Sequence, residues 1–387
     1  MISRILLPLL ILLLLPDLYF HFRKRRRNIK RRLLFALPSI ALAVYAISLA
    51  LTPHFAPKNI AWLNWFLLLL GLYAIPRFLY ALCTAIGFTI CRLSHRRVNW
   101  GKLAGFILAI LCIYIVLYGT FFGTDQMKVR HAEFTSADLP ASFDGYRIAL
   151  FADAHVGSSA GNKGIANIQM AVDSILAQEA DMIVFAGDLE NMQPSEIDPV
   201  QPELSRLHAI DGVYSVLGNH DYAMYLKADS LTSALNEQLI QSKERSMGWT
   251  LLMNENRIIR RGNDSIFVAG MENLGQPPFP KKGDLEATLK GVHPKAFTLL
   301  LQHDPTAWRQ TILPQSHAQL TLSGHTHGAQ FSLFGWSPAS MVYDEWGGMY
   351  HELKRALYVT TGIGGFVPFR FGMPPEVVII TLHSSKP

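Results

Sequence analysis

The sequence has little charge and almost no cysteine. Charged residues make up 17% of the 387 positions and hydrophobic residues 50%, a composition too apolar for an intrinsically disordered chain. The three cysteines, Cys83, Cys91 and Cys112, all lie in apolar segments of the first third. Residues 124–387 therefore contain no cysteine, which excludes a disulfide framework, a thiolate metal site and a cysteine nucleophile from that part.

The first third also lacks acidic residues. Residues 1–123 hold fifteen Lys and Arg but a single acid, Asp17, whereas residues 124–387 hold twenty Lys and Arg and twenty-eight Asp and Glu. The net charge of +6 thus combines +14 in the first part with −8 in the second. Because nucleic-acid binding relies on basic surface and the second part is acidic, we expect no nucleic-acid partner, and a nuclease is disfavoured.

Residues 1–123 are predicted to form a transmembrane region of about four helices, because four apolar stretches come near the ~20 residues that cross a bilayer. The stretches are Ile5–Phe22, Leu33–Leu51, Ile60–Leu82 and Leu103–Phe122. The first lacks the small-residue cleavage site of a signal peptide, so we expect an uncleaved span. We interpret Asp17 as lying near the end of a kinked helix and Arg77 as reaching the membrane interface.

The loops between these stretches predict an orientation. Arg23–Arg32 carries eight positive charges, Thr52–Asn59 carries one, and Arg92–Lys102 carries four. Because basic loops stay in the cytoplasm, this alternation predicts a multi-pass protein of the cell (inner) membrane with residues 124–387 on the extracytoplasmic side. One alternative stays open: the tract after Ile60 continues to Cys91, and a second crossing there would invert the topology.

Short β-rich runs alternate with helix-like stretches after Gly123, which predicts an α/β domain. The runs are Tyr146–Phe151, Met182–Ala186, Val213–Leu217, Ile266–Ala269, Phe297–Leu301, Gln319–Leu322, Leu357–Thr361 and Val377–Leu382.

Residues of metal-ligand types follow five of these runs. They are Asp153-Ala-His155, Gly187-Asp188, Gly218-Asn-His-Asp221, Gln302-His303 and Ser323-Gly-His-Thr-His327. The carboxyl ends of strands are where α/β sheets collect their chemistry, and mixed nitrogen and oxygen ligands suit Mn, Fe or Zn. Any one of these motifs alone is as readily a turn or a structural histidine. Five together, each behind a predicted strand, indicate a metal site.

In this order the five blocks resemble the signature of the calcineurin-like metallophosphoesterases, Asp-x-His, Gly-Asp, Gly-Asn-His-Asp/Glu, His and Gly-His-x-His. Further segments resemble the membrane-associated bacterial branch typified by YkuE and YaeI: Leu139-Pro-x-x-Phe-Asp-Gly145, Gly364-Gly365, Pro368-x-Arg370 and Pro374-Pro-Glu376. The resemblance implies a four-layer α/β/β/α sandwich with two mixed sheets. The expected division is a transmembrane region at 1–123, a linker and first strand at 124–145, and a metallophosphoesterase domain at 146–387.

The resemblance also implies a pair of divalent metal ions, Mn, Fe or Zn. By the family pattern one ion is held by Asp153, His155 and His327, the other by Asn219, His303 and His325, and Asp188 bridges them. His220 is no ligand in that pattern but faces the scissile phosphate and assists the leaving oxygen, and Asp221 orients it. Two divalent ions, two aspartates and a bridging hydroxide leave a charge of about +1, which favours a phosphate anion.

We therefore expect a membrane-anchored phosphoric ester hydrolase that cleaves a phosphodiester or pyrophosphate bond by attack of the metal-bridging hydroxide. Its fusion to several spans indicates a substrate carried by a lipid or envelope component. UDP-diacylglucosamine is one candidate by family analogy, but it requires a cytoplasmic active site. A phosphomonoesterase or protein phosphatase using the same site stays open, as does an inactive membrane receptor or scaffold. Nothing in the sequence predicts an oligomeric state.

Overall fold

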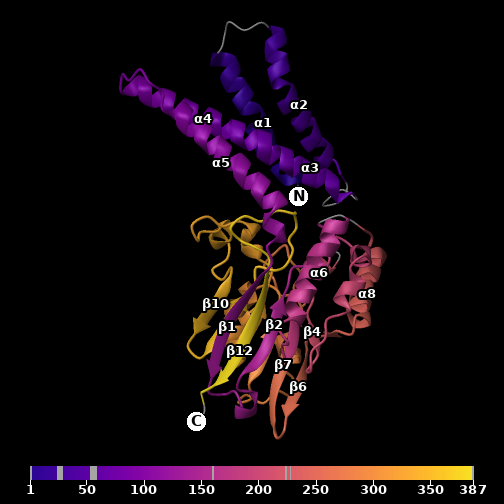
Figure 1. The fold of residues 1–387 in the computed structure, drawn as a ribbon. Helices are drawn as coiled ribbons and strands as arrows, with labels where there is room; N and C mark the ends of the chain where they lie inside the picture. Colours follow the sequence, from indigo (N-terminus) through magenta and orange to yellow (C-terminus); the bar gives the residue numbers. More distant parts are fainter. Residues whose placement is uncertain are drawn as a thin grey trace. The chain divides into compact units, whose positions relative to one another are not determined.

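The chain folds into two compact units, Met1–Phe122 and Gly123–Pro387 (Figure 1). The computed structural model describes residues 2–23, 29–52, 59–158, 161–222, 225–226 and 228–385. Much of the first basic loop, at 24–28, and most of the second loop, at 53–58, lie outside these described residues.

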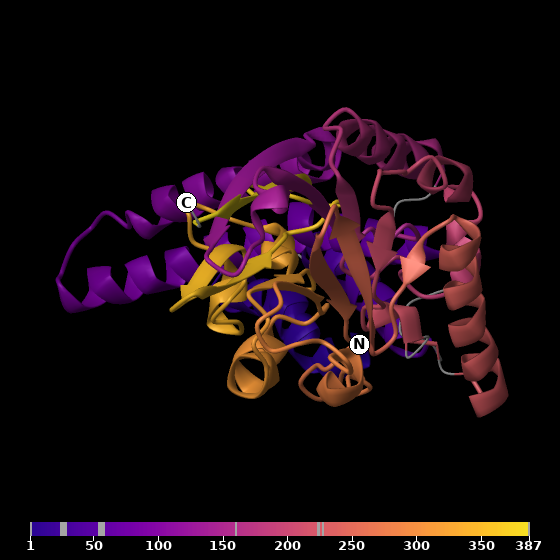
Figure 2. The same ribbon diagram turned by 90° about the horizontal axis from the view of Figure 1, so that it is seen from below.

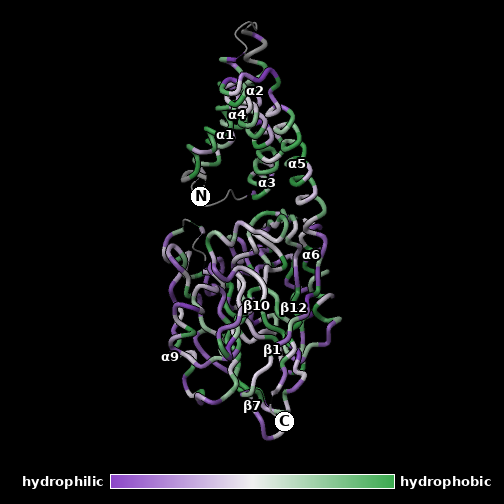
Figure 3. Tube along the Cα trace, turned by 90° about the vertical axis from the view of Figure 1, so that its left-hand side faces the viewer, coloured by the Kyte–Doolittle hydropathy of each residue, from purple (hydrophilic) through white to green (hydrophobic). Residues whose placement is uncertain are grey.

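The first unit is helical and mostly apolar, as the predominance of green along its helices in Figure 3 shows. Its helices are α1 (Ile2–Arg23), α2 (Ile29–Ala50), α3 (Ile60–Leu69), the π-helical turn η1 (Leu70–Ala74), α4 (Ile75–Leu93) and α5 (Gly101–Phe121). Three segments are long and apolar enough to cross a membrane: Ile5–Arg23, Ile60–Leu93 and Gly101–Asp125. Leu34–Ala50 is a shorter apolar helix.

The tract from Ile60 to Leu93 is a single helix, so it does not cross twice. Pro76 lacks the backbone N–H that an α-helix uses, and the π-helical turn Leu70–Ala74 directly precedes it. The widened turn accommodates the proline without a reversal of the chain, and α4 continues to Leu93. The tract is one 34-residue span instead of one that ends near Leu82.

Asp17 and Arg77 pair with each other, which corrects the interpretation of Arg77 as reaching the membrane interface. The guanidinium of Arg77 contacts a carboxylate oxygen of Asp17, and each side chain is 12% exposed. Arg77 also donates to Ser39 Oγ at 2.9 Å and to the hydroxyl of Tyr73. Because a buried charge needs a partner, these contacts tie α1, α2 and the helix from Ile60 to Leu93 together.

The second unit contains two six-stranded mixed sheets. In spatial order the first consists of β1 (Lys128–Ser136), β12 (Glu376–Ser384), β2 (Tyr146–Phe151), β3 (Met182–Phe185), β4 (Val213–Ser215) and β5 (Thr250–Leu251). The second consists of β10 (Gly348–Glu352), β11 (Arg355–Val359), β9 (Leu320–Ser323), β8 (Thr298–Leu301), β7 (Asp264–Gly270) and β6 (Glu255–Arg261). The strands β2 to β5 run parallel, as do β7, β8, β9 and β11.

Helices cover the outer faces of the sheets. They are α6 (Asn162–Leu176), α7 (Gln201–Leu204), α8 (Ser230–Ser246), α9 (Leu285–Thr288) and α10 (Leu313–Gln315). Short helical turns join the elements: η2 (Gly123–Asp125), η3 (Ala141–Phe143), η4 (Pro194–Ile197), η5 (His220–Tyr222), η6 (Trp308–Ile312), η7 (His327–Gln330) and η8 (Pro338–Met341). In Figure 2 the sheets lie between α6 and α8 on one side and the orange helical turns around residues 285–315 on the other.

Alternation along the strands builds three apolar layers. Ile148 and Leu150 of β2 face Val268 and Leu299 of the second sheet in the core between the sheets. The intervening Ala149 and Phe151 face the helix α6 instead, in a second cluster. A third cluster packs Trp308 and the neighbouring turns on the outer face of the second sheet. This is the predicted four-layer α/β/β/α sandwich.

Candidate metal centre

The predicted ligands come from the carboxyl ends of five strands, as the sequence indicates. The first sheet supplies Asp153 and His155 after β2, Asp188 after β3, and Asn219 after β4. The second supplies His303 after β8, and His325 and His327 after β9. Because β2, β3 and β4 run parallel, and so do β8 and β9, each sheet delivers its ligands to one edge. The site forms where the two edges meet.

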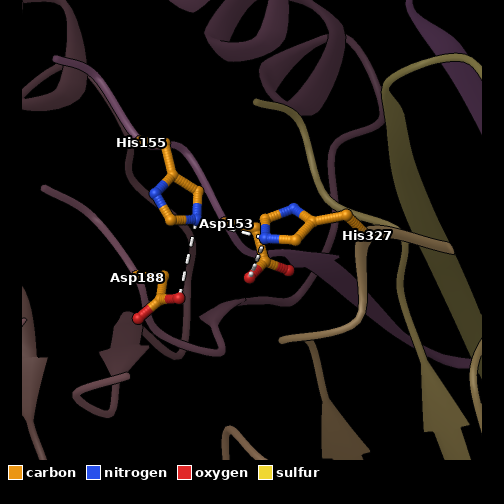
Figure 4. A group of neighbouring side chains, drawn as sticks. All are labelled: Asp153, His155, Asp188 and His327. Atoms are coloured by element: carbon orange, nitrogen blue, oxygen red, sulfur yellow. Dashed lines mark hydrogen bonds and ion pairs between the residues drawn. The ribbon is translucent and has the colours of Figure 1, made fainter. Parts of the chain in front are cut away.

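One group consists of Asp153, His155, Asp188 and His327, with one possible ligand atom from each within 4.8 Å of the others (Figure 4). Nε2 of His155 lies 3.2 Å from Nε2 of His327 and 3.5 Å from Oδ2 of Asp188. Nε2 of His327 lies 3.8 Å from Oδ1 of Asp153. The four side chains thus point at a common centre.

A second group, Asp188, His303 and His325, shares Asp188 with the first. Nε2 of His303 lies 3.1 Å from Oδ2 of Asp188 and 3.3 Å from Nδ1 of His325. The same carboxylate oxygen of Asp188 therefore faces both groups, which is the position of a bridging ligand. Asn219 lies in the adjoining turn, where the neighbouring N–H of His220 donates to Oδ1 of Asp188 at 2.8 Å.

The hydrogen bonds around these histidines leave lone pairs aimed into the site. Nδ1 of His155 bonds Oδ1 of Asn191 at 3.1 Å, and Nδ1 of His303 bonds the carbonyl of Ala186 at 2.7 Å. Both acceptors fix the proton on Nδ1, so in the neutral rings each Nε2 presents a lone pair to the centre. Oδ1 of Asn219 and Nδ1 of His327 are buried without a hydrogen-bond partner among the described residues.

The protonation states of the histidines and the charges of the carboxylates also favour bound cations. Burial lowers the pKa of His155 to about 3 and that of His325 to about 4, so both rings are neutral donors of lone pairs. Burial opposes protonation of His303 as well, but the charges of Asp188 and Asp153 outweigh it and raise the pKa of His303 to about 10. Lone pairs that converge on two carboxylates fit a pair of divalent ions.

The ligand-bearing turns have an unusual backbone. Five of the seven predicted ligands have positive φ: Asp153 (54°), His155 (42°), Asp188 (61°), His325 (76°) and His327 (52°). This left-handed region is unfavourable for residues with a Cβ and concentrates at functional sites. In this backbone conformation the side chains of these five residues point across the ends of the strands toward the centre of the site.

His220 lies beside the first group, with its ring centroid 4.5 Å from that of His155. The sequence predicts that Asp221 orients it, but the structure assigns that contact to Asn191, whose carbonyl lies 2.6 Å from Nδ1 of His220. Asp221 instead accepts the backbone N–H groups of four residues: Asp188, Leu189, Glu190 and Gly218. It is buried and ties the turn after β3 to the turn after β4.

Several groups around the site carry no motif and were not predicted. Tyr225 stacks on His220 at 4.0 Å between ring centroids, and its hydroxyl accepts from Asn219 at 2.6 Å. The hydroxyl of Tyr343 lies 3.0 Å from Nε2 of His325, and Asp304 lies 3.6 Å from the same nitrogen. Only the position of Asp304, directly after His303, could have drawn attention to it. These side chains orient the predicted ligands and line the site.

Arg370, which resembles a family motif, is structural. Its side chain is buried, and its guanidinium donates to the backbone carbonyls of five residues: Thr361, Gly362, Gly364, Met373 and Pro374. Burial lowers its pKa to about 10. Glu345 forms an ion pair with Arg309. The charged groups of Arg370 and Glu345 are therefore both already bound within the protein.

A two-sheet α/β sandwich with two adjoining groups of nitrogen and oxygen atoms that could hold metal ions fits a metal-dependent phosphoesterase. Comparison with known families agrees: residues 146–329 match the profile described as "Calcineurin-like phosphoesterase". Residues 3–124 match the profile "Probable Calcineurin-like phosphoesterase, transmembrane domain". The chain therefore carries a calcineurin-like metallophosphoesterase domain, preceded by an N-terminal transmembrane domain that makes it a membrane protein.

Three relatives illustrate the match. The "Uncharacterized metallophosphoesterase YkuE" of Bacillus subtilis is 29% identical over 70% of this chain and 90% of its own length. A "Transmembrane protein with metallophosphoesterase domain" of Danio rerio is 29% identical over 76% of this chain and 66% of its own length. The "UDP-2,3-diacylglucosamine pyrophosphatase LpxG" of Chlamydia trachomatis is 26% identical over 63% of this chain and 86% of its own length.

Proposed function

We propose that the chain is a membrane-anchored phosphoesterase that hydrolyses a phosphodiester or pyrophosphate bond in a lipid- or envelope-linked substrate. The observation that carries the proposal is the convergence of six predicted ligands in two groups that share Asp188. Asp153, His155, Asp188 and His327 would hold one divalent ion, and Asp188, Asn219, His303 and His325 the other. Such a pair supplies a water of lowered pKa and positive charge for the phosphoryl oxygens.

Two neighbouring groups, the carbonyl of Asn191 and the ring of Tyr225, hold His220 in position to act as a proton donor. The carbonyl of Asn191 holds the proton of His220 on Nδ1, so a protonated ring has its Nε2–H left to give to the leaving oxygen. Tyr225 stacks on this ring and restricts its rotation. Because the metal pair would supply the attacking water, no protein nucleophile is needed. This agrees with a second unit that lacks cysteine.

The substrate class is supported by the membrane domain and by one relative. Six residues separate the end of α5 at Phe121 from the start of β1 at Lys128, a reach of at most about 25 Å. The catalytic unit is thus tethered to the membrane, where lipid-linked esters are concentrated. The printed name of LpxG describes a pyrophosphatase that acts on a diacylated nucleotide sugar.

The helices support an extracytoplasmic position for the catalytic unit. Because Ile60–Leu93 is one helix, the basic loop Arg92–Lys102 and the catalytic unit flank the single span α5. With that loop in the cytoplasm, the catalytic unit lies outside. Protease added to intact spheroplasts should then degrade residues 124–387. Protection that is lost only on permeabilisation would place the unit inside and favour a nucleotide-linked glycolipid.

The activity is tested on the full-length protein in detergent, loaded with Mn²⁺. We expect hydrolysis of bis(p-nitrophenyl) phosphate, and His220→Ala should lower kcat roughly 10²- to 10⁴-fold without loss of bound metal. His208→Ala is the matched control, because His208 is exposed and its ring bonds the carbonyl of Arg206, away from the predicted ligands. A preference for p-nitrophenyl phosphate would identify a phosphomonoesterase. Bound metal without hydrolysis of either ester would favour a receptor or scaffold.

A further inference from the structure

An exposed apolar loop follows the last predicted ligand. Residues 331–343 contain no charged side chain. Within them Phe334 is 100% exposed, Met341 77%, Val342 75% and Trp336 51%. We call residues 333–342 the apolar loop. Large apolar side chains scattered singly over a surface are ordinary, but four within nine consecutive residues of an uncharged segment indicate a surface that a membrane or another molecule covers.

The tip of the apolar loop is built against local preference. Leu333 and Trp336 exchange backbone hydrogen bonds of 2.9 and 3.1 Å, which closes a two-residue turn. Its central residues, Phe334 and Gly335, have φ of 52° and 79°. Turns with positive φ at both central positions favour Asn or Gly at the first, because a Cβ is crowded there. Neither folding nor solubility therefore accounts for a fully exposed phenylalanine at this position.

The apolar loop is connected to the predicted metal centre through its middle and through the residue that follows it. Ser337 is buried and donates to the carbonyl of Gly328, one residue after His327, at 2.6 Å. Beyond the loop, the hydroxyl of Tyr343 contacts His325. Whatever covers Phe334 and Trp336 is thus held beside the site where the phosphate ester would react.

We propose that the apolar loop inserts into the surface of a lipid bilayer and so presents the metal centre to phosphate esters of lipids. This inference rests on the proposed function and specifies its substrate as an amphiphile that stays in the membrane. A lipid surface suits the loop better than a protein partner because the segment offers no charge and pairs Trp with Phe, as membrane-interface segments do. The short connection from α5 keeps a bilayer within reach.

The chain offers a matched control at Leu353. This residue is 95% exposed and also has positive φ (55°), in the turn between β10 and β11. Because β11 runs parallel to β9, that turn lies at the opposite edge of the sheet from His325. Leu353 shares the exposure and backbone of Phe334 but not its place beside the metal centre.

The first test compares Phe334→Asn with Leu353→Asn in full-length protein reconstituted in phosphatidylcholine–phosphatidylglycerol vesicles. Both variants should unfold at or above the wild-type temperature, since Asn tolerates positive φ. Phe334→Asn should lower kcat/KM for p-nitrophenyl hexadecyl phosphate in the vesicles about tenfold, and leave that for soluble bis(p-nitrophenyl) phosphate unchanged. Leu353→Asn should change neither. Equal turnover of the lipid ester by Phe334→Asn and wild type would overturn the proposal.

The second test reads insertion directly and does not depend on activity. Phe334→Cys and Leu353→Cys, each in a chain whose native cysteines are replaced by alanine, carry an environment-sensitive dye. Nitroxides on the acyl chains should quench the dye at position 334 and not at position 353. Equal quenching would refute insertion. A dye that responds to protein concentration in detergent but not to nitroxide lipids would show that a second copy covers the loop. If wild type cleaves neither ester, the proposed function fails, while quenching still decides the lipid contact.

Discussion

Asp221 is predicted from the sequence to orient His220, but its carboxylate instead connects the turn after β3 to the turn after β4 by hydrogen bonds. This structural role can be tested. Its Oδ2 accepts the N–H groups of Asp188 and Gly218, each at 2.8 Å. Its Oδ1 accepts those of Leu189 at 2.9 Å and Glu190 at 3.2 Å. In Asp221→Asn one of the two oxygens becomes an amide NH₂, which cannot accept, so two buried N–H groups lose their partner.

Each orphaned buried N–H costs about 1–3 kcal/mol, so the variant should lose roughly 2–6 kcal/mol of stability. For a unit of this size that corresponds to a fall of roughly 5–20 °C in unfolding temperature. Asp188 and Asn219 lie on the tied turns, so metal binding should weaken together with stability.

The assay is thermal unfolding of the full-length protein in detergent, followed by tryptophan fluorescence, with bound metal measured on the same samples. Asp229→Asn is the control, because Asp229 caps α8 at its exposed N-terminus and Asn caps equally well. If Asp221→Asn unfolds like wild type and keeps its metal while kcat falls, the carboxylate acts in the chemistry and the assignment here is wrong.

Three further predictions concern charge and metal. Burial raises the pKa of Glu244 well above its usual value, so the folded state keeps a proton that the unfolded chain releases, and stability falls as pH rises past the unfolded pKa. Glu244→Gln, which retains an acceptor for Ser215, should therefore raise the unfolding temperature more at about pH 8 than at about pH 5, and an equal rise at both would contradict this. Asp17→Leu should destabilise the membrane unit by about 3–5 kcal/mol by leaving Arg77 without a carboxylate partner, whereas adding Arg77→Met should restore most of the loss in a double-mutant cycle. Removal of metal by a chelator should lower the unfolding temperature by roughly 5–10 °C when free metal had been about a hundredfold above its Kd, and no shift would argue against ions in this site.

The strands that carry the ligands could be predicted because their signal is local. Tyr146–Phe151 and Met182–Ala186 are short apolar runs that end in polar residues, and both appear within a residue of the expected bounds. A buried parallel strand needs apolar side chains on both faces, so its ends are visible as a change of composition. The same reasoning placed His303 and His325 behind β8 and β9.

Contacts between distant positions left no such signal. Asp17 and Arg77 lie sixty residues apart, and each alone fits a residue near a helix end. The role of Asp221 depends on backbone N–H groups, which every residue carries and no motif marks. The turn at Phe334 carries neither Asn nor the charge pattern of an exposed loop, so propensity predicts no tight turn there.

The residues of the predicted metal centre depart from local conformational and electrostatic preferences, and these departures share one cause. Asp153, His155 and Asp188 occupy a backbone region that disfavours residues with a Cβ, at about 1–2 kcal/mol each. The same turns point the neutral ring nitrogen of His155 at the carboxylate of Asp188 across 3.5 Å, which repels without a cation between them. The well-packed sandwich beneath these turns stabilises their strained backbone. Bound cations would convert the repulsion between the ligands into attraction. The predicted metal dependence of stability and the positions of the predicted ligands would therefore be two consequences of one arrangement.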